Sequence, residues 1–297
     1  MHILELIRWK NLLMLVFSSA LIRFALIPGF GANTQMDLLA YTLLVISIIC
    51  IAAGGNIVND FFDITTDSIN KPDRLLIDRV ISRQTALQLY FMVNAIGVGL
   101  AFYLFLTQAF EQFGLVFYIL VFSPLLLAAY SIWLKRLALI GNVLVSLLVG
   151  LSLFCMGTAL VNEDRYPVAF FTICVYSCLA FLLNLCRELI KDLEDIRGDN
   201  FCNMTTLPIL IGKKRCNYIV FGLLTFIILV LLSVVMSYFL TLNLLIFYVF
   251  VFILLPLILI SKQVLDASSE NHYKKISLHL KLVFLTGICS MLTFLIL

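Results

Sequence analysis

The chain has 297 residues, of which 63% are hydrophobic and only 12% are charged. A soluble domain usually has about a quarter of its residues charged, so this composition excludes an ordinary soluble protein and indicates an integral membrane protein. The 20 Lys and Arg against 17 Asp and Glu leave a net charge of +3, which excludes a general polyanion binder such as a nucleic-acid protein. The eight Cys form no CxxC pair, which argues against a disulfide framework or a zinc site.

Nine apolar runs are long enough to cross a bilayer, since each crossing needs about 20 helical residues. We therefore predict an all-α polytopic fold in which residues 1–297 form one membrane-embedded domain. The first run contains Arg23 and has no clear small-residue cleavage site, so we expect it to remain as an anchor rather than to be removed as a signal peptide. The predicted spans are residues 12–28, 38–58, 85–106, 113–133, 137–161, 166–186, 218–240, 242–260 and 276–297.

The basic residues set the predicted orientation, because Lys and Arg are enriched in cytoplasmic loops. With the N-terminus inside, the inner segments hold every Lys and Arg except Arg23, which lies in a span, and Arg165, which lies in an outer loop. A missed or invented span would break this alternation. We therefore predict a multi-pass protein of the cell membrane, with its N-terminus in the cytoplasm and its C-terminus outside.

Two of the inner loops, residues 58–84 and 187–217, are long and acidic, and long loops in compact proteins are often functional. Both contain a DxxDxxxD motif, and the same interval separates each aspartate of the first motif from its counterpart in the second. At about 100° per residue, the three aspartates of a motif share one helix face if the helix continues beyond the membrane. The first motif comprises Asp60, Asp63 and Asp67, and the second comprises Asp192, Asp195 and Asp199.

The repeated motif also predicts how the two halves of the chain are arranged. Both motifs follow spans that run from outside to inside, so the halves are parallel rather than inverted repeats. We expect nine helices in two parallel pseudo-repeats, with the two acidic faces meeting across a central cavity at the inner side of the membrane.

The acidic motifs predict a metal site. Three carboxylates on one face repel one another, and a helix C-terminus disfavours each negative charge by about 0.3–1 kcal/mol. Oxygen ligands without nearby Cys or His suit Mg²⁺, which completes its shell with water and substrate phosphate. We therefore assign all six aspartates as metal-binding and catalytic, with a diphosphate as the bound group. The alternative, solvated helix ends at the membrane rim, does not explain two copies with equal spacing.

Polar and basic residues near the two motifs are candidates for binding the diphosphate. Arg suits bidentate phosphate contacts, and Lys acts as a point charge. The alternative explanations are the positive-inside bias for the cations and an interfacial aromatic belt for Tyr130. The predicted substrate-binding residues are Asn56, Asn59, Arg74, Arg79, Tyr130, Lys135 and Lys191.

These residues resemble the UbiA superfamily of intramembrane prenyltransferases. Residues 59–67 are similar to the first aspartate-rich motif of that family, residues 192–199 to the second, and residues 130–135 to its tyrosine–lysine segment. Residues 8–11 look like its N-terminal substrate-facing stretch, which adds Asn11 to the predicted substrate-binding residues. The family also has nine helices and two acidic inner loops, so the resemblance covers nearly the whole chain.

The resemblance implies Mg²⁺-dependent transfer of a prenyl group from a polyprenyl diphosphate to an acceptor. Residues 70–74 and 187–195 look most like the branch that makes ether lipids, which adds a geranylgeranyl group to geranylgeranylglyceryl phosphate. Within the family, an aromatic quinone precursor or a haem-type acceptor is the alternative. Outside it, the alternatives are a non-catalytic scaffold and a transporter for divalent ions or phosphometabolites, although transporter sites usually lie near the membrane midplane. Membrane lipids are the other expected partners, and neither a nucleic acid nor a protein partner is implied.

Overall fold

The computed structural model describes residues 2–108, 110–237 and 243–296, with the backbone alone at 74, 110–112, 237 and 243. Within this part of the chain the regular structure is helical, and β-type pairing is limited to the isolated bridges Ile77–Ile81 and Leu137–Thr205. The prediction of an all-α fold is confirmed.

Nine helical runs among the described residues are long and apolar enough to cross a membrane. Each coincides with one predicted span, so the number and order of the spans are confirmed. The observed spans are Trp9–Gly29, Leu38–Phe62, Arg83–Thr107, Phe113–Ile132, Ile140–Thr158, Pro167–Glu194, Lys213–Met236, Leu244–Asp266 and Glu270–Ile296. The span ends predicted at 238–240, 242 and 297 lie outside the described residues.

Short helical segments extend or connect the long helices. In chain order the elements are α1 (His2–Leu6), α2 (Trp9–Leu21), η1 (Ile22–Leu26), α3 (Ile27–Gly29), α4 (Leu38–Phe62), α5 (Ile64–Asn70), η2 (Pro72–Arg74), α6 (Arg83–Thr107), α7 (Phe110–Ile132), η3 (Leu134–Arg136), α8 (Ile140–Thr158), α9 (Pro167–Glu194), α10 (Ile196–Phe201), α11 (Leu207–Ile211), α12 (Lys213–Ser237), α13 (Asn243–Val249), η4 (Phe250–Leu254), α14 (Leu255–Asp266), α15 (Glu270–Cys289) and η5 (Ser290–Ile296). The first and eighth spans each contain a π-helical turn, η1 or η4.

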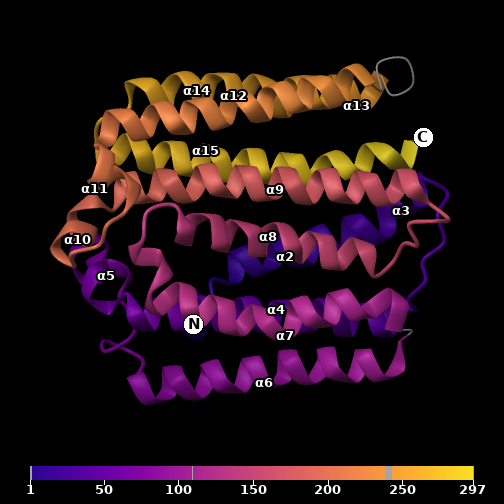
Figure 1. The fold of residues 1–297 in the computed structure, drawn as a ribbon, viewed down its shortest axis with the longest axis horizontal. Helices are drawn as coiled ribbons and strands as arrows, with labels where there is room; N and C mark the ends of the chain where they lie inside the picture. The colour runs from indigo at the N-terminus through magenta and orange to yellow at the C-terminus, as the bar shows by residue number, and fades with distance from the viewer. Residues whose placement is uncertain (1, 109, 238–242, 297) are drawn as a thin grey trace.

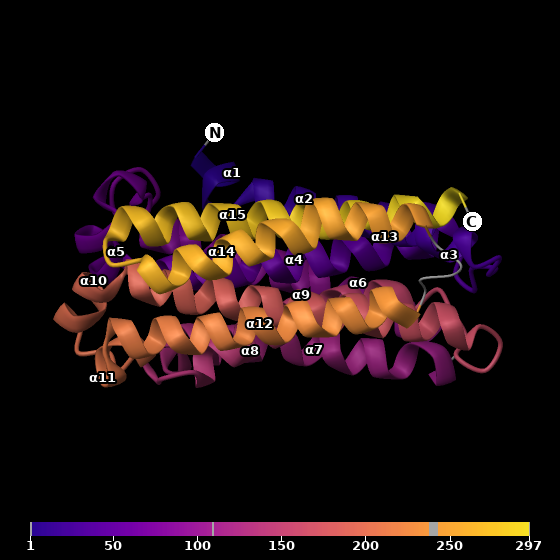
Figure 2. The same ribbon diagram turned by 90° about the horizontal axis from the view of Figure 1, so that it is seen from above.

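The long helices lie side by side in layers (Figure 1). In that view α12 and α14 lie at the top, α15 and α9 come next, then α8 and α2, then α4 and α7, and α6 lies at the bottom. Contacts of α12 with α9, α14 with α15, α8 with α9, α7 with α8, and α4 with α6 hold the layers together. The short helices α5, α10 and α11 lie at the same end of the bundle in both views (Figures 1 and 2).

The two acidic segments are more helical than the sequence predicts. The regions predicted as loops, 58–84 and 187–217, begin with the ends of α4 and α9, which run on to Phe62 and Glu194. Each long helix then ends at an aspartate in the bridge region of backbone space, Asp63 (φ −94°, ψ 3°) or Asp195 (φ −97°, ψ 9°), before a short helix begins. The condition for a shared helix face, one continuous helix per motif, is therefore not met, because the third aspartate lies on the separate helix α5 or α10. The break recurs at the equivalent position of each half, as expected for parallel repeats.

Two large apolar cores hold the bundle together. One lies mainly among α2, α4, α7 and α8, the other lies mainly among α9, α12, α14 and α15, and Phe284 packs against both. A small third cluster packs Leu6 of α1 and Ile77 of the loop after η2 against Ile57 of α4. This third cluster fixes the N-terminal segment at the end of the bundle that carries the acidic motifs.

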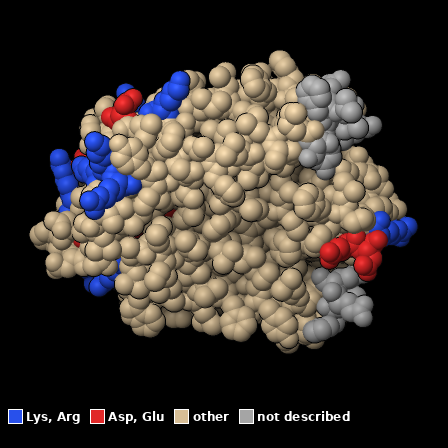
Figure 3. All heavy atoms as spheres, turned by 45° about the horizontal axis from the view of Figure 1, so that its top comes forward, with Lys and Arg blue, Asp and Glu red and all other residues tan. Residues whose placement is uncertain are grey.

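Charged side chains gather at the two ends of the molecule, and a broad uncharged belt separates them (Figure 3). On the face shown, Lys and Arg are concentrated at the left end, which is the end of α5, α10 and α11 in Figure 1. The belt corresponds to the nine apolar spans. The protein is therefore a multi-pass integral membrane protein, with its polar ends outside the apolar layer.

Candidate active site

The carboxylate of Asp60, near the end of α4, pairs with a cation from the N-terminal segment. Arg8 Nη2 lies 2.6 Å from Asp60 Oδ1, and this carboxylate raises the pKa of the Arg8 guanidinium above its ordinary value. Arg8 itself has a left-handed backbone conformation, with φ 55°. Asn56 Nδ2 donates at 2.9 Å to the carbonyl of Ile7, the residue before Arg8. Asn56 therefore positions Arg8 beside the first motif.

The carboxylate of Asp63 pairs with a buried lysine. Lys135 Nζ lies 2.5 Å from Asp63 Oδ1, and the Lys135 side chain is only 8% exposed. Lys135 comes from η3, which lies directly against the start of α8: a Cβ at Gly141 would lie 2.7 Å from Lys135 Cα. The glycine permits the close backbone approach that brings Lys135 to the first motif.

Asn70 and Lys71, at the end of α5, join the first acidic segment to the second motif. Lys71 Nζ lies 2.6 Å from Asp195 Oδ2 and 3.8 Å from Glu194 Oε1. Asn70 Nδ2 donates to the Asp195 carbonyl at 3.0 Å, and Asn70 Oδ1 accepts a hydrogen bond from the Gly198 N–H at 2.8 Å. A Cβ at Gly198 would lie 2.5 Å from Asn70 Nδ2, so the contact requires glycine. These contacts bring the two acidic motifs together.

The motif carboxylates also act on one another electrostatically. Burial raises the pKa of Asp199 to about 7, and the carboxylates of Asp195 and Asp63 raise it as well. Burial raises the pKa of Asp67 to about 6, with contributions from Asp63 and Asp60. Asp63 thus influences aspartates of both motifs, so the two motifs form one electrostatic site. Carboxylates that resist ionisation in this way favour a bound cation.

Asp192 is held by a residue of α8 rather than by a cation. Its Oδ2 accepts a hydrogen bond from Asn142 Nδ2 of α8 at 2.9 Å. The second motif is therefore anchored to α8 through Asp192 and to α5 through Asp195. These two anchors fix where α9 ends relative to both neighbouring helices.

The chemistry of the donor set fits Mg²⁺. All six motif residues offer carboxylate oxygens, and Mg²⁺ typically takes only one or two protein carboxylates, with water and phosphate completing its shell. Within the described residues, no three Asp, Glu, His or Cys side chains are arranged as a ready-made metal site. Instead a cation pairs with each of Asp60, Asp63 and Asp195. Among the described residues the aspartates are therefore not gathered into a preformed ligand group, and their assignment as metal ligands stays a prediction.

Tyr130 and Lys191 lie near the site but have different neighbours. Tyr130, near the end of α7, lies within the electrostatic influence of Glu188 and Asp63. Lys191 Nζ pairs with Glu188 Oε1 at 2.5 Å, and Arg187 Nη1 lies 3.4 Å from the same oxygen. Lys191 thus contacts Glu188 rather than a motif aspartate.

The other predicted substrate-binding residues are distributed around this end of the bundle. Asn11 of α2 accepts a hydrogen bond from Lys281 of α15 at 2.7 Å. Asn59 is half-buried on α4, one residue before the first motif aspartate. Arg79 is exposed on the loop between η2 and α6, and its side chain makes no hydrogen bond or ion pair with another described residue. The side chain of Arg74 lies outside the described part of the chain.

The sequence analysis assigned no role to Asn70 or Asn142. Asn142 lies at the start of an apolar span, and a polar residue in such a position is a signal for a buried polar contact. No local pattern shows the role of Asn70, because its partner Asp195 lies 125 residues further along the chain.

The sequence matches known prenyltransferases over most of its length. The UbiA prenyltransferase family matches residues 13–286. Digeranylgeranylglyceryl phosphate synthase of Methanosarcina mazei is 32% identical over 237 residues, which is 77% of each chain. The same enzyme of Methanopyrus kandleri is 37% identical over 182 residues, and that of Thermococcus gammatolerans is 36% identical over 197 residues. The chain spans 61% and 65% of the length of these last two relatives.

Solved structures show the same architecture. A UbiA homolog from Aeropyrum pernix K1 superposes with a TM-score of 0.67 at 17% identity, covering 100% of this chain and 98% of that one. A digeranylgeranylglyceryl phosphate synthase gives a TM-score of 0.65 at 25% identity, covering 98% of each chain. A UbiA homolog from Archaeoglobus fulgidus bound to DMAPP and Mg²⁺ gives 0.56 at 15% identity, covering 98% of this chain and 99% of that one. With the family match over residues 13–286, the chain belongs to the UbiA prenyltransferase family.

Proposed function

We propose that this protein transfers the geranylgeranyl group of geranylgeranyl diphosphate to the hydroxyl of geranylgeranylglyceryl phosphate. The observation that carries the proposal is the contact between the two acidic motifs through Asn70, Lys71 and Asp195. A diphosphate needs anionic metal ligands and cations close together, and this end of the bundle supplies both. The names of the relatives, and the DMAPP and Mg²⁺ held by the Archaeoglobus homolog, support the same reaction class.

The reaction exchanges one C–O bond for another. The acceptor oxygen forms a bond to C1 of the prenyl chain, the bond from C1 to the diphosphate oxygen breaks, and the acceptor hydroxyl loses its proton. Negative charge develops on the departing diphosphate, so the site must stabilise that charge. The apolar bundle around the prenyl chain keeps water away from the allylic centre while this charge develops.

Two lysines are placed to bind the leaving diphosphate. Lys71 pairs with Asp195 of the second motif, and Lys135 pairs with Asp63 of the first. With a metal held by the carboxylates, both ammonium groups would be free to donate to phosphate oxygens. Arg74, Arg79 and Tyr130 remain our predicted further contacts to the diphosphate.

The metal belongs between the two motifs. All six motif aspartates remain its proposed ligands, because carboxylates of the two motifs influence one another. Two of them also pair with other side chains, Asp60 with Arg8 and Asp192 with Asn142. Mg²⁺ bound there would neutralise charge on the leaving diphosphate oxygens.

The direct test is product formation by the purified protein in detergent. Labelled geranylgeranyl diphosphate, Mg²⁺ and a panel of acceptors are incubated with it, and the lipid products are identified by mass. The panel comprises geranylgeranylglyceryl phosphate, an aromatic quinone precursor and haem. We expect the digeranylgeranyl product and no prenylated aromatic. Transfer to the aromatic acceptor alone would refute the assignment of the acceptor, and flux of phosphometabolite into liposomes without any product would favour a transporter.

Variants of the motifs test the assignment of the site. Asp63→Asn and Asp195→Asn should each reduce turnover by at least about 100-fold, because they weaken the charge stabilisation of the leaving group. Ser68→Ala is the matched control: Ser68 is an exposed residue of α5 whose hydroxyl donates to the Thr65 carbonyl and bonds to no other described residue. Wild-type turnover in both aspartate variants would defeat the assignment.

The positive end of the bundle supports an orientation as well. We infer that the end carrying α5, α10 and α11 faces the cytoplasm, because Lys and Arg concentrate there. A reporter that fluoresces only in the cytoplasm should then be active when it is fused to the N-terminus and inactive when it is fused to the C-terminus. The reverse pattern would invert the orientation.

A further inference from the structure

A second group of cations lies beside the acidic site, between α2, α9 and α15. Arg187 and Lys191 of α9 both contact Glu188, at 3.4 Å and 2.5 Å. Lys281 of α15 donates to Asn11 Oδ1 of α2 at 2.7 Å and lies within the electrostatic influence of Arg187. Arg187 and Lys191 therefore share one carboxylate, Lys281 has an amide oxygen as its partner, and among the described residues none of the three cations pairs with an aspartate of either motif.

Arg187 has unused hydrogen-bonding capacity. Its Nε atom is buried and has no hydrogen-bond partner among the described residues, and its contact with Glu188 is long at 3.4 Å. A buried donor without a partner is costly. A guanidinium in this state, with a second uncompensated cation nearby, is suited to an anion that accepts from both.

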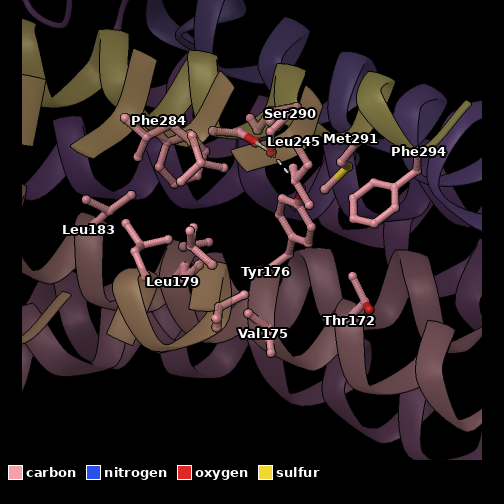
Figure 4. A pocket seen from close by; sticks show the side chains of 18 of the residues that line it. Thr172, Val175, Tyr176, Leu179, Leu183, Leu245, Phe284, Ser290, Met291 and Phe294 are labelled. Atoms are coloured by element: carbon pink, nitrogen blue, oxygen red, sulfur yellow. Dashed lines mark hydrogen bonds between the residues drawn. The ribbon is translucent and has the colours of Figure 1, made fainter. Parts of the chain in front are cut away.

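An apolar cavity begins one helical turn from these cations. It has a volume of about 550 Å³ and lies between α9, α12, α13 and α15, within the usual range of about 300–1,000 Å³ for ligand pockets. Leu183 and Phe284 lie toward one end of it, and Thr172 and Phe294 lie toward the other (Figure 4). Leu183 precedes Arg187 by four residues on α9, and Phe284 follows Lys281 by three on α15.

The cations lie on the same helix faces as the cavity lining. At about 100° per residue, Arg187 is within about 40° of Leu183 and Tyr176 on α9, and Lys281 is within about 60° of Phe284 on α15. Both helices therefore present a cation at the end of the cavity nearer the acidic site and apolar side chains along its length. This arrangement matches an elongated ligand with an anionic head and an apolar chain.

We propose that Arg187 and Lys281 bind the phosphate of the lipid acceptor, and that the acceptor's prenyl chain lies in the apolar cavity. This inference rests on the proposed function and adds to it the place and the chemical class of the acceptor, a prenylated glycerol phosphate. Arg187 supplies the planar donor pair that matches a phosphate, and Lys281 supplies a point charge. Arg187 precedes Asp192 by five residues, about 8 Å along α9, so the acceptor phosphate and the donor diphosphate use different cations.

Substitutions of the two cations test the phosphate contact. Arg187→Gln and Lys281→Gln should each raise the KM for geranylgeranylglyceryl phosphate at least tenfold, while the KM for geranylgeranyl diphosphate changes less than threefold. The unphosphorylated geranylgeranylglycerol should react equally well with wild-type protein and with both variants. A merely structural role would instead change all three values together. An unchanged KM for the phosphorylated acceptor in both variants overturns the proposal.

A glycine in the cavity wall tests where the chain lies. Gly287 lines the cavity, and a Cβ placed on it meets no atom within 4 Å, so Gly287→Leu introduces its side chain into open space at the cavity wall. We expect a higher KM for the geranylgeranyl acceptor and little change for an acceptor with a single isoprene unit. Gly222→Leu is the matched control, because Gly222 of α12 also has open space around it but does not line the cavity. A rise in the KM for geranylgeranyl diphosphate instead would assign the cavity to the donor chain and overturn this part of the proposal.

Binding measured without turnover separates this inference from the proposed function. Geranylgeranylglyceryl phosphate alone, without donor or Mg²⁺, should raise the Tm of the wild-type protein but not that of Arg187→Gln or Lys281→Gln. If the wild-type protein shows this shift but makes no product, the phosphate site stands and the proposed function fails. If it makes product while both variants keep the shift, the phosphate site fails and the proposed function stands. Equal shifts with phosphatidic acid or with inorganic phosphate would assign the site to bilayer lipid or to a free ion and overturn the acceptor assignment.

Discussion

The contact between the two acidic motifs depends on Asn70, and its removal should be measurable in both stability and turnover. Asn70→Ala deletes the hydrogen bonds to the Asp195 carbonyl at 3.0 Å and from the Gly198 N–H at 2.8 Å. Each is worth about 1 kcal/mol, and leaving the buried Gly198 N–H unpaired costs about 1–3 kcal/mol more. We expect the free energy of unfolding to fall by about 3–5 kcal/mol.

This loss has two measurable consequences. At about 2–4 °C per kcal/mol for a large protein, the Tm in detergent should fall by roughly 6–20 °C. The reacting groups also lose their relative placement, and a displacement of about 1 Å reduces turnover about 100-fold. Prenyl transfer by Asn70→Ala, assayed below its Tm and at saturating Mg²⁺, should fall by that order.

Two further variants make the test decisive. Ser68→Ala on the same helix keeps both contacts between the motifs, so its Tm and turnover should match those of the wild-type protein. Asn70→Asp keeps an acceptor for the Gly198 N–H but loses the donor to the Asp195 carbonyl, so it should be intermediate in stability. A Tm for Asn70→Ala within 1–2 °C of the wild-type value, with unchanged turnover, would refute the view that this residue joins the motifs.

Three other outcomes are expected. The folded Asp199 carboxyl has a pKa of about 7, well above the value of about 4 in an unfolded chain. The metal-free protein should therefore lose stability as pH rises from about 4 to 7, which a Tm series would show. Asp199→Asn should reduce this dependence, and Asp67, whose pKa burial raises to about 6, should account for part of what is left. Lys135→Gln should lower kcat at least tenfold, because it removes a proposed contact to the diphosphate. It should also lower the Mg²⁺ concentration needed for half-maximal activity, because the Lys135 ammonium pairs with the motif carboxylate of Asp63. An increased Mg²⁺ requirement would contradict this. Gly54→Leu should destabilise the protein by more than about 1–3 kcal/mol, since a Cβ at Gly54 would lie 2.3 Å from Asn94 Nδ2, whereas Gly99→Leu, with open space around it, should unfold at the wild-type temperature.

Much of the fold could be predicted from local patterns. Apolar runs of about 20 residues identify spans because a bilayer leaves no other place for them, and all nine predicted spans coincide with observed ones. Their ends were less predictable: α9 continues to Glu194, eight residues beyond the last residue of the predicted span. Hydropathy marks where the apolar layer ends. The helix itself can continue into water, because its backbone hydrogen bonds form there as well.

The break at Asp63 and at Asp195 could not be predicted from periodicity. The spacing of the aspartates is compatible with one continuous helix face, yet each third aspartate lies on a separate short helix. The contacts of Asn70 with Asp195 and Gly198 hold α5 against α10. These contacts link residues far apart in the chain, so no window of sequence contains both partners.

The sequence alone determined that this is a nine-span membrane protein with two acidic motifs of equal spacing. Both features are local: an apolar run of about 20 residues is enough to place a helix in the bilayer, and the spacing of a motif depends only on residues close together in the chain. Only the tertiary structure decided which cation meets which carboxylate: Arg8 with Asp60, Lys135 with Asp63, and Lys71 with Asp195. It also placed an apolar cavity one turn beyond Arg187. These ion pairs depend on the packing of helices that are distant in sequence. Two charges interact strongly only when the fold brings them within a few ångströms of each other, so the sequence alone does not identify the partners.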